Sequence, residues 1–305
     1  MDNPNAQVPF LRMHSFVFKE LADWLPDHTK VLLSQTCRGI RTMLQINNMV
    51  PALSASEHVR LLVQHARSNA KVWVCAGCKK RHRITKRDFM QPRGHPSCPY
   101  RKSSRPGEEV SGINYARVQL ALKYNRLAAA DDSLRHYLNK LRSYEADNKV
   151  VRHKNSFEIF EWFSSPRVVD ARFLMHYRWE FRMHGASYTP SVFPRLKICN
   201  HQRLRRPADG VAWCDQRKQL FWVVVKAMLF SRKGEEWLGN CPFCPTDFAV
   251  RSFDNGMRID AWKDFGPEDG PGNPTWMSHY LSEAQRTPSD RGSVRRLYDS
   301  YDEMH

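Results

Sequence analysis

The chain has 305 residues, of which 41% are hydrophobic, so it can bury one large core or two modest ones and lacks the composition of a disordered protein. Its 48 lysines and arginines exceed its 31 aspartates and glutamates, which gives a formal net charge of +17. This excess favours contact with a polyanion, which could be nucleic acid, an acidic protein or an anionic membrane surface, and it selects none of the three.

Targeting signals and cysteine usage indicate the compartment. The opening MDNPNAQVPFLRM lacks the apolar stretch of a secretory signal, and the longest apolar run, residues 220–230, is too short to span a membrane. We therefore expect an intracellular protein of the nucleus or cytoplasm, with no membrane partner. In that reducing environment its 8 cysteines are expected as thiols or metal ligands rather than disulfides.

The first part of the chain is predicted to form short helices. Residues 9–46 show two helical stripes separated by a break at Pro26, and Cys37 lies on the second stripe, where we expect it in the core. A third stripe follows between residues 59 and 66. The stripe residues are Val17, Leu21, Trp24 and Leu25; Leu33, Cys37, Ile40 and Leu44; and Val59, Leu62, Val63 and Ala66.

The middle of the chain mixes strand and helix signals. KVWVC, residues 71–75, predicts a strand that leads into a cysteine pair, and residues 102–112 read as a polar connector. Residues 115–127 predict a helix that is apolar on two sides. Residues 134–141 predict one further helix.

The last part is predicted to be mainly antiparallel strands. In residues 172–182 aromatic and charged side chains alternate, which is typical of a strand with one buried face. The run 220–230 is interpreted as a buried strand, and Asn255-Gly256 predicts a hairpin turn. Residues after about 285 are expected to form a loose polar tail.

This order predicts an α+β fold rather than alternating β–α–β units. We expect an N-terminal helical segment over residues 1–50 and helices with a first zinc knuckle over residues 51–145. An antiparallel β region with a second zinc site is expected over residues 146–285, followed by the tail over residues 286–305.

The stretch LGNCPFCPTDF supplies half of a tetrahedral metal site. Cys241 and Cys244 form a C-x2-C turn, and the partners best suited to complete it are Cys199 and His201 in KICNHQ. In an extended segment two residues at this spacing point to the same side. Cys214 is the substitute ligand if His201 points away.

A second set of ligands lies in CAGCKKRHRITKRDFMQPRGHPSC. Cys75 and Cys78 form the first knuckle, and Cys98 is the expected third ligand. His95 is the preferred fourth ligand because it makes a second knuckle with Cys98. His82, close behind the first knuckle, is the alternative.

Both sites are predicted to hold structural zinc, two ions in all, and we expect no enzyme activity. A catalytic zinc keeps an open coordination position and usually has a carboxylate nearby, whereas each set here offers four protein ligands. The sequence contains no H-E-x-x-H or H-x-E pattern, no Gly-rich phosphate loop and no nucleophile elbow.

Basic residues gather next to both cysteine pairs. Basic side chains on zinc loops are one route to phosphate contacts, although the spacing is not that of a base-reading finger. The aromatic residues between 173 and 181 could stack on bases, but an alternating stripe is more typical of a core. The candidate polyanion contacts are Lys79, Lys80, Arg81, Arg83, Lys86, Arg87, Arg203, Arg205 and Arg206.

The N-terminal segment VPFLRMHSFVFKELADWLPDHTKVLLSQTCRGIRTML resembles an F-box. The matching features are a Pro-containing start, a helix, a second Pro turn and the pattern L-S-x-T-C-R-x-hydrophobic-R. Together with C-x2-C, ICNH, CPFCPTDF and GMRIDAW, residues 9–276 resemble a set of fungal F-box-like proteins. The residues that carry the F-box pattern are Pro9, Leu21, Leu25, Pro26, Leu33, Ser34, Thr36, Cys37, Arg38, Ile40 and Arg41.

The resemblance implies a substrate receptor of a cullin–RING ubiquitin ligase. Its helices would dock through an apolar face on the Skp-type adaptor, and the rest of the chain would hold an unknown protein substrate. The alternative is a zinc-stabilised protein that binds nucleic acid through its basic loops. The residues expected to form the docking face are Phe10, Leu11, Phe18, Leu21, Leu25 and Leu33.

Overall fold

The structure is a computed structural model, and the chain divides into two compact units, residues 1–83 and 84–305. The residues that the structure describes are 15–36, 38–44, 53–85, 98, 109–110, 113–128, 134–135, 138–139, 157–183, 196–204, 219–230, 234–254, 256–281, 287 and 289–304.

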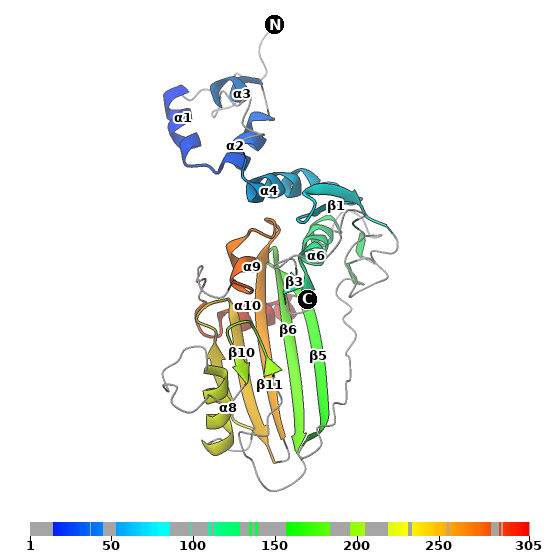
Figure 1. Ribbon diagram of the computed structural model, residues 1–305, viewed down its shortest axis with the longest axis vertical. Coiled ribbons are helices and arrows are strands. Elements are labelled where there is room, and N and C mark those ends of the chain that lie inside the picture. Colours follow the sequence, from blue (N-terminus) through cyan, green and yellow to red (C-terminus); the bar gives the residue numbers. More distant parts are fainter. Residues whose placement is uncertain are drawn as a thin grey trace. The chain divides into compact units, whose positions relative to one another are not determined.

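The first unit is helical and ends in a hairpin (Figure 1). Pro26 lies between the first and second helices, where the sequence predicted a break, and it is also the N-cap residue of the second helix. The fourth helix begins with a capping box, in which Ser54 and Glu57 satisfy each other's backbone N–H groups. The elements are α1 (Ser15–Asp23), α2 (Asp27–Ser34), α3 (Arg38–Leu44), α4 (Ala55–Ala66), β1 (Val72–Cys75) and β2 (Lys80–Arg83).

Two small cores hold the first unit together. Val31 of α2 packs against Leu61 of α4, and Val59 and Val63 on the same helix pack against Val74 of β1. The predicted stripe over residues 59–66 is therefore the buried face of α4. Cys37, expected in the core, lies outside the described residues.

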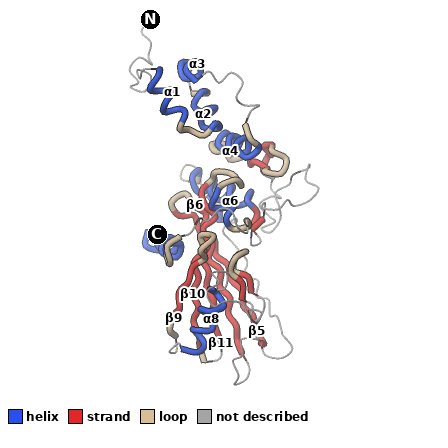
Figure 2. Tube along the Cα trace, turned by 60° about the vertical axis from the view of Figure 1, so that its left-hand side comes forward, coloured by secondary structure: helices blue, strands red, loops and turns tan. Residues whose placement is uncertain are grey.

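A five-stranded antiparallel sheet forms the centre of the second unit (Figures 1 and 2). Its strand order is β5-β6-β11-β10-β9, and the turn between β10 and β11 pairs Phe253 with Gly256. The hairpin predicted at Asn255-Gly256 is confirmed, although Asn255 itself is not among the described residues. The strands are β5 (Phe157–Val169), β6 (Arg172–Met183), β9 (Glu236–Asn240), β10 (Thr246–Phe253) and β11 (Gly256–Pro267).

The alternation in β6 divides the sheet into two faces. Phe173, Tyr177 and Phe181 are buried, so the aromatic stripe is core and its rings are not exposed for base stacking. On the opposite face Leu174 packs beneath a C-terminal helix. This period of two is the pattern that the sequence predicted.

The apolar run interpreted as a buried strand is instead the helix α8 (Gln219–Phe230), and that prediction is wrong. Leu220, Phe221, Val224 and Ala227 form its buried face, and the Ser252 hydroxyl of β10 donates to the Ala227 carbonyl. The helical spacing is hidden in the sequence because the remaining positions are apolar too. Leu229 and Phe230, for example, are apolar although they lie on the exposed part of the helix.

The polar tail after about residue 285 was expected to be loose, but it contains the helix α10 (Ser293–Met304), so that prediction is also wrong. Val294 and Tyr298 pack on Leu174 and Trp262 of the sheet. Ala249 lies beneath α10, whereas Ser252, at the opposite parity of β10, contacts α8. The two helices therefore cover opposite faces of the sheet, with α10 behind it in Figure 1.

The remaining elements complete an α+β fold with an antiparallel sheet, as predicted. The helix at residues 115–127 is buried nearly all round, which explains its two apolar sides, and most of the helix expected over residues 134–141 lies outside the description. Within the described residues, no helix is long and apolar enough to cross a membrane. These elements are α6 (Tyr115–Leu127), α9 (Pro274–Ser278), β3 (Glu109–Val110), β4 (Ile113–Asn114), β7 (Leu196–Lys197) and β8 (Arg203–Leu204).

Candidate metal centres

Cys199, His201, Cys241 and Cys244 meet in the second unit and are called the 199–244 cluster. Their four ligand atoms lie within 4.8 Å of one another, and all four residues are buried. A tetrahedral zinc with Zn–S bonds of ~2.3 Å separates its ligand atoms by roughly 3.5–4 Å. The 4.0 Å between Cys199 Sγ and His201 Nδ1 agrees with that spacing, so this donor set fits a tetrahedral ion.

Two tight turns position these four ligands. Cys199 and His201 lie in the loop between β7 and β8, which is closed by the Ile198 N–H donating to the Gln202 carbonyl at 3.1 Å. Cys241 and Cys244 lie between β9 and β10, where the Cys241 N–H donates to the Thr246 carbonyl at 2.8 Å. These two closed turns thereby hold the ligand atoms of the four residues in place.

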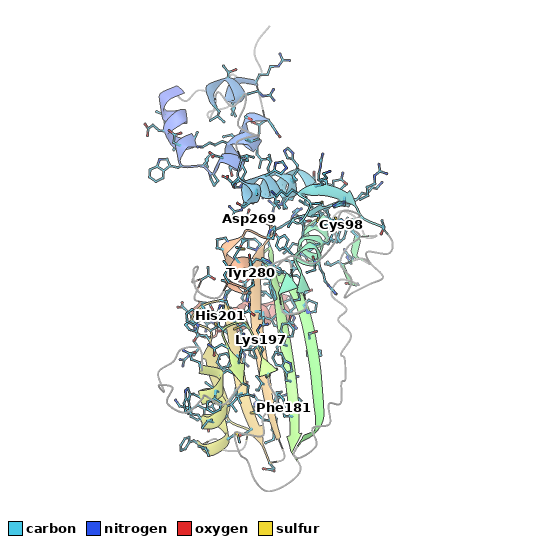
Figure 3. The ribbon with its side chains drawn as sticks, viewed as in Figure 1. Cys98, Phe181, Lys197, His201, Asp269 and Tyr280 are labelled. Carbon is cyan, nitrogen blue, oxygen red and sulfur yellow. The ribbon has the colours of Figure 1, made fainter. Side chains whose placement is uncertain are left out.

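Neighbouring groups orient the ligands. The Nε2–H of His201 donates to the Leu281 carbonyl at 2.9 Å, which leaves the lone pair of Nδ1 directed at the sulfurs. The Thr246 hydroxyl lies 3.3 Å from Cys244 Sγ, and the Phe243 ring packs 5.2 Å from the imidazole. In the view of Figure 3, His201, Lys197 and Tyr280 are labelled near one another over the sheet, and Phe181 is labelled farther along it.

The electrostatics of the three thiols also fit a cation. Burial and the adjoining Cys199 sulfur raise the pKa of Cys241 to about 12, and burial raises that of Cys244 as well. Burial opposes ionisation of Cys199 too, but hydrogen bonds from the Cys241 and Cys244 thiols hold its pKa well below the usual value. One thiolate thus forms at the expense of the others, and a bound cation would allow all three to ionise.

A second group of ligands, Cys75, Cys78, His82 and Cys98, is called the 75–98 cluster. Their ligand atoms also lie within 4.8 Å of one another, with Cys75 buried and the other three partly exposed. Cys78 Sγ is 2.9 Å from His82 Nε2, and the Trp73 ring packs on that imidazole at 5.1 Å. The structure places His82, the alternative ligand, in the fourth position; His95, the preferred one, is outside the described residues.

The turn between β1 and β2 brings the first two cysteines together. Cys75 pairs with Lys80 in the hairpin register, and the Lys79 N–H donates to the Cys75 carbonyl at 2.9 Å. Lys79 has a positive φ of 56°, a left-handed conformation that closes such a turn. Cys214, the substitute ligand for the other cluster, lies outside the described residues.

Part of the predicted basic surface is exposed. Lys79, Lys80, Arg81 and Arg83 are exposed around the β1–β2 hairpin, and Arg203 is exposed on β8. The remaining candidates Lys86, Arg87, Arg205 and Arg206 are not among the described residues.

The expected docking face is visible in part. Leu21 is 51% exposed, while Leu25 and Leu33 are partly buried. Phe10, Leu11 and the side chain of Phe18 lie outside the description. Val17 and Trp24, 45% and 87% exposed, belong to the same helical stripe but were missing from the expected face. Their apolar side chains, on the same helical stripe as Leu21, are the sequence feature that could have added them to the expected docking face.

Comparison of the chain with protein-family models, with curated proteins and with solved structures finds no match. The geometry of the two clusters is therefore the basis for assigning a function. Each cluster could hold a metal ion through three sulfurs and one nitrogen.

Proposed function

We propose that the protein is a non-catalytic intracellular binding protein whose two clusters each hold a structural zinc ion. The observation that carries this proposal is the 199–244 cluster, where four buried ligand atoms from two separate turns lie within 4.8 Å. Three thiolates and an imidazole suit zinc, and four protein ligands leave no position for a reacting water. Zinc would stabilise the fold by joining β7–β8 to β9–β10.

Elemental analysis of the purified chain tests the metal assignment, with two zinc ions per chain expected. Cys241→Ser should lose one ion and lower the Tm, because serine is a poor zinc ligand and the remaining thiols stay buried. Cys214→Ser is the control and should keep both ions. Unchanged zinc content and Tm in Cys241→Ser would contradict the assignment.

We propose further that the first unit docks on the Skp-type adaptor of a cullin–RING ubiquitin ligase, so that the second unit presents an unknown protein substrate. The F-box-like sequence pattern supports this role, as do three exposed apolar side chains: Val17 and Leu21 on α1 and Trp24 directly after it. Exposed apolar groups so close together are typical of a partner surface.

A pulldown with the recombinant adaptor tests this role. The wild type should retain the adaptor, and Leu21→Asp should lose it because a carboxylate is then buried in an apolar interface. Glu20→Gln changes the adjacent exposed residue and should bind normally. Absence of adaptor from the wild-type sample would count against the role.

Nucleic-acid binding is the second candidate function, favoured by the four exposed basic residues of the β1–β2 hairpin, Lys79, Lys80, Arg81 and Arg83. Phosphate contacts release counterions, so binding to DNA or RNA should weaken steeply with salt. Lys80→Glu combined with Arg81→Glu should reduce that salt dependence. Salt-independent binding would rule out phosphate contacts by this hairpin.

A further inference from the structure

Lys263 is a buried lysine in the middle of the sheet. It lies on β11 between Thr246 of β10 and Met175 of β6, and it is only 2% exposed. A buried ammonium is costly unless nearby groups stabilise its charge. The groups around Lys263 therefore indicate which negative charge its ammonium stabilises.

The surroundings of Lys263 connect it to the 199–244 cluster. Its cross-strand partner Thr246 contacts Cys244 Sγ through the hydroxyl, and the Lys263 Nζ lies 4.6 Å from the centre of the Tyr177 ring. Burial lowers the pKa of Lys263 to about 8, while the charges of Cys199 and Cys244 oppose that drop.

The net charge of the 199–244 cluster with zinc bound gives a reason for a cationic side chain beside it. A zinc ion with three thiolates and one neutral imidazole has a net charge of −1. In a buried position this charge is poorly screened, and one ammonium cancels it. The nearby His279 imidazole instead donates its Nε2–H to the backbone carbonyl of Asp264 at 2.7 Å.

We propose that Lys263 is the counter-ion of the metal–thiolate centre formed by Cys199, His201, Cys241 and Cys244, and that its ammonium controls how firmly the ion is retained. This inference rests on the proposed zinc binding. It gives the lysine a role in metal retention that is separate from packing. The Tyr177 ring helps to hold the ammonium in place through a cation–π contact.

Zinc release tests the proposal. The folded, zinc-loaded full chain is mixed with an excess of a chromogenic chelator, and the slow phase of release is timed. Lys263→Met keeps the length of the side chain and removes its charge, and we expect release about tenfold faster or more. Lys197→Met is the matched control because Lys197 is an exposed lysine near Cys199, whose charge solvent screens. Its release should stay within about twofold of wild type.

The outcomes separate this inference from the metal assignment. A wild-type chain without zinc refutes the metal assignment and the inference with it. A wild type with zinc and a Lys263→Met variant that releases it at the same rate overturns only the inference. If Lys263→Met does not fold, Lys263→Arg and Lys263→Gln are compared instead. Slow release from the arginine variant and fast release from the glutamine variant support the counter-ion, whereas equal rates overturn it.

Discussion

His201 donates a hydrogen bond from Nε2 to the backbone carbonyl of Leu281 at 2.9 Å, across 80 residues of sequence. The same ring directs Nδ1 at the sulfur of Cys199. One imidazole therefore joins the β7–β8 loop to the metal ligands on one side and to the segment after α9 on the other. A side chain in this position determines both the donor set of the cluster and the position of a distant backbone segment.

The two roles of His201 can be separated by substitution. His201→Cys supplies a fourth thiolate and should keep the ion, whereas His201→Ala should lose it. Both variants lose the bond to Leu281, so the cysteine variant should still be less stable than wild type by ~1 kcal/mol. Cobalt substitution checks the donor set, because its absorption bands respond to replacement of nitrogen by sulfur. Zinc retained at full occupancy in His201→Ala would show that the imidazole is not a ligand.

The ligands of the 199–244 cluster were predictable because their information is local. The spacings C-x2-C and C-x-H specify short turns that place two metal-ligating side chains on the same side. These ligands can therefore be recognised from the local sequence, with little knowledge of the rest of the fold. The bond to Leu281 was not predictable, since a backbone carbonyl carries no sequence signature. Lys263 was not predicted either, because its position beside Thr246 depends on the register of β10 and β11, which the local sequence does not show.

The errors in secondary structure have a different cause. In α8 the helical period is masked because nearly every position is apolar. In α10 the period is present, with Val294, Leu297, Tyr298 and Tyr301 on one face, but the overall polarity favoured a loose tail. Its N-terminus is capped by Asp247 from the sheet, which a search for a local cap cannot find.

Asp247 should be essential for keeping α10 in place. Its buried carboxylate accepts N–H groups of Gly292, Val294 and Arg295 at 2.8–3.0 Å, which are donors that a helix start leaves unsatisfied. Asp247→Ala should cost ~1–3 kcal/mol and expose residues 293–304 to proteolysis. Asp247→Asn keeps one acceptor oxygen and should lose less. Both quantities are measured by urea unfolding and limited digestion, and a stable, protease-resistant alanine variant would contradict the cap.

Gly239 is expected to tolerate no side chain. It pairs with Phe248 across β9 and β10, and a Cβ atom at this position would lie 2.5 Å from Cε2 of the buried ring. Gly239→Ala should therefore destabilise the protein by ~1–3 kcal/mol through overpacking.

A double-mutant cycle with Phe248→Leu checks the cause of that loss. The smaller side chain makes room for the methyl group, so the double variant should be more stable than the sum of the single effects predicts. Simple additivity in thermal unfolding would indicate that the ring is not what excludes alanine.

Asp260 should make stability depend on acid pH. It is buried and accepts hydrogen bonds from His176 at 2.7 Å and from Arg178 at 2.8 Å. Burial opposes its ionisation, but these hydrogen bonds outweigh burial and lower its pKa below the usual value. A carboxylate with a lowered pKa stabilises the fold above its unfolded pKa of about 4, and the contribution is lost as pH falls through the folded pKa.

Asp260→Asn is accordingly expected to be less stable than wild type by ~1–3 kcal/mol at pH 7, with the difference shrinking as pH falls below about 4. Urea unfolding of both proteins across that range measures it. Burial raises the pKa of Asp247 and Asp264, which gives the opposite pH dependence, but both residues are present in the two proteins, so their effect cancels in the comparison. Glu180→Gln, which loosens a partly exposed pair with Arg258 at 3.6 Å, serves as the control and should cost at most ~0.5 kcal/mol. A stability gap that stays constant from pH 7 to pH 3 would show that the charge of Asp260 does not contribute.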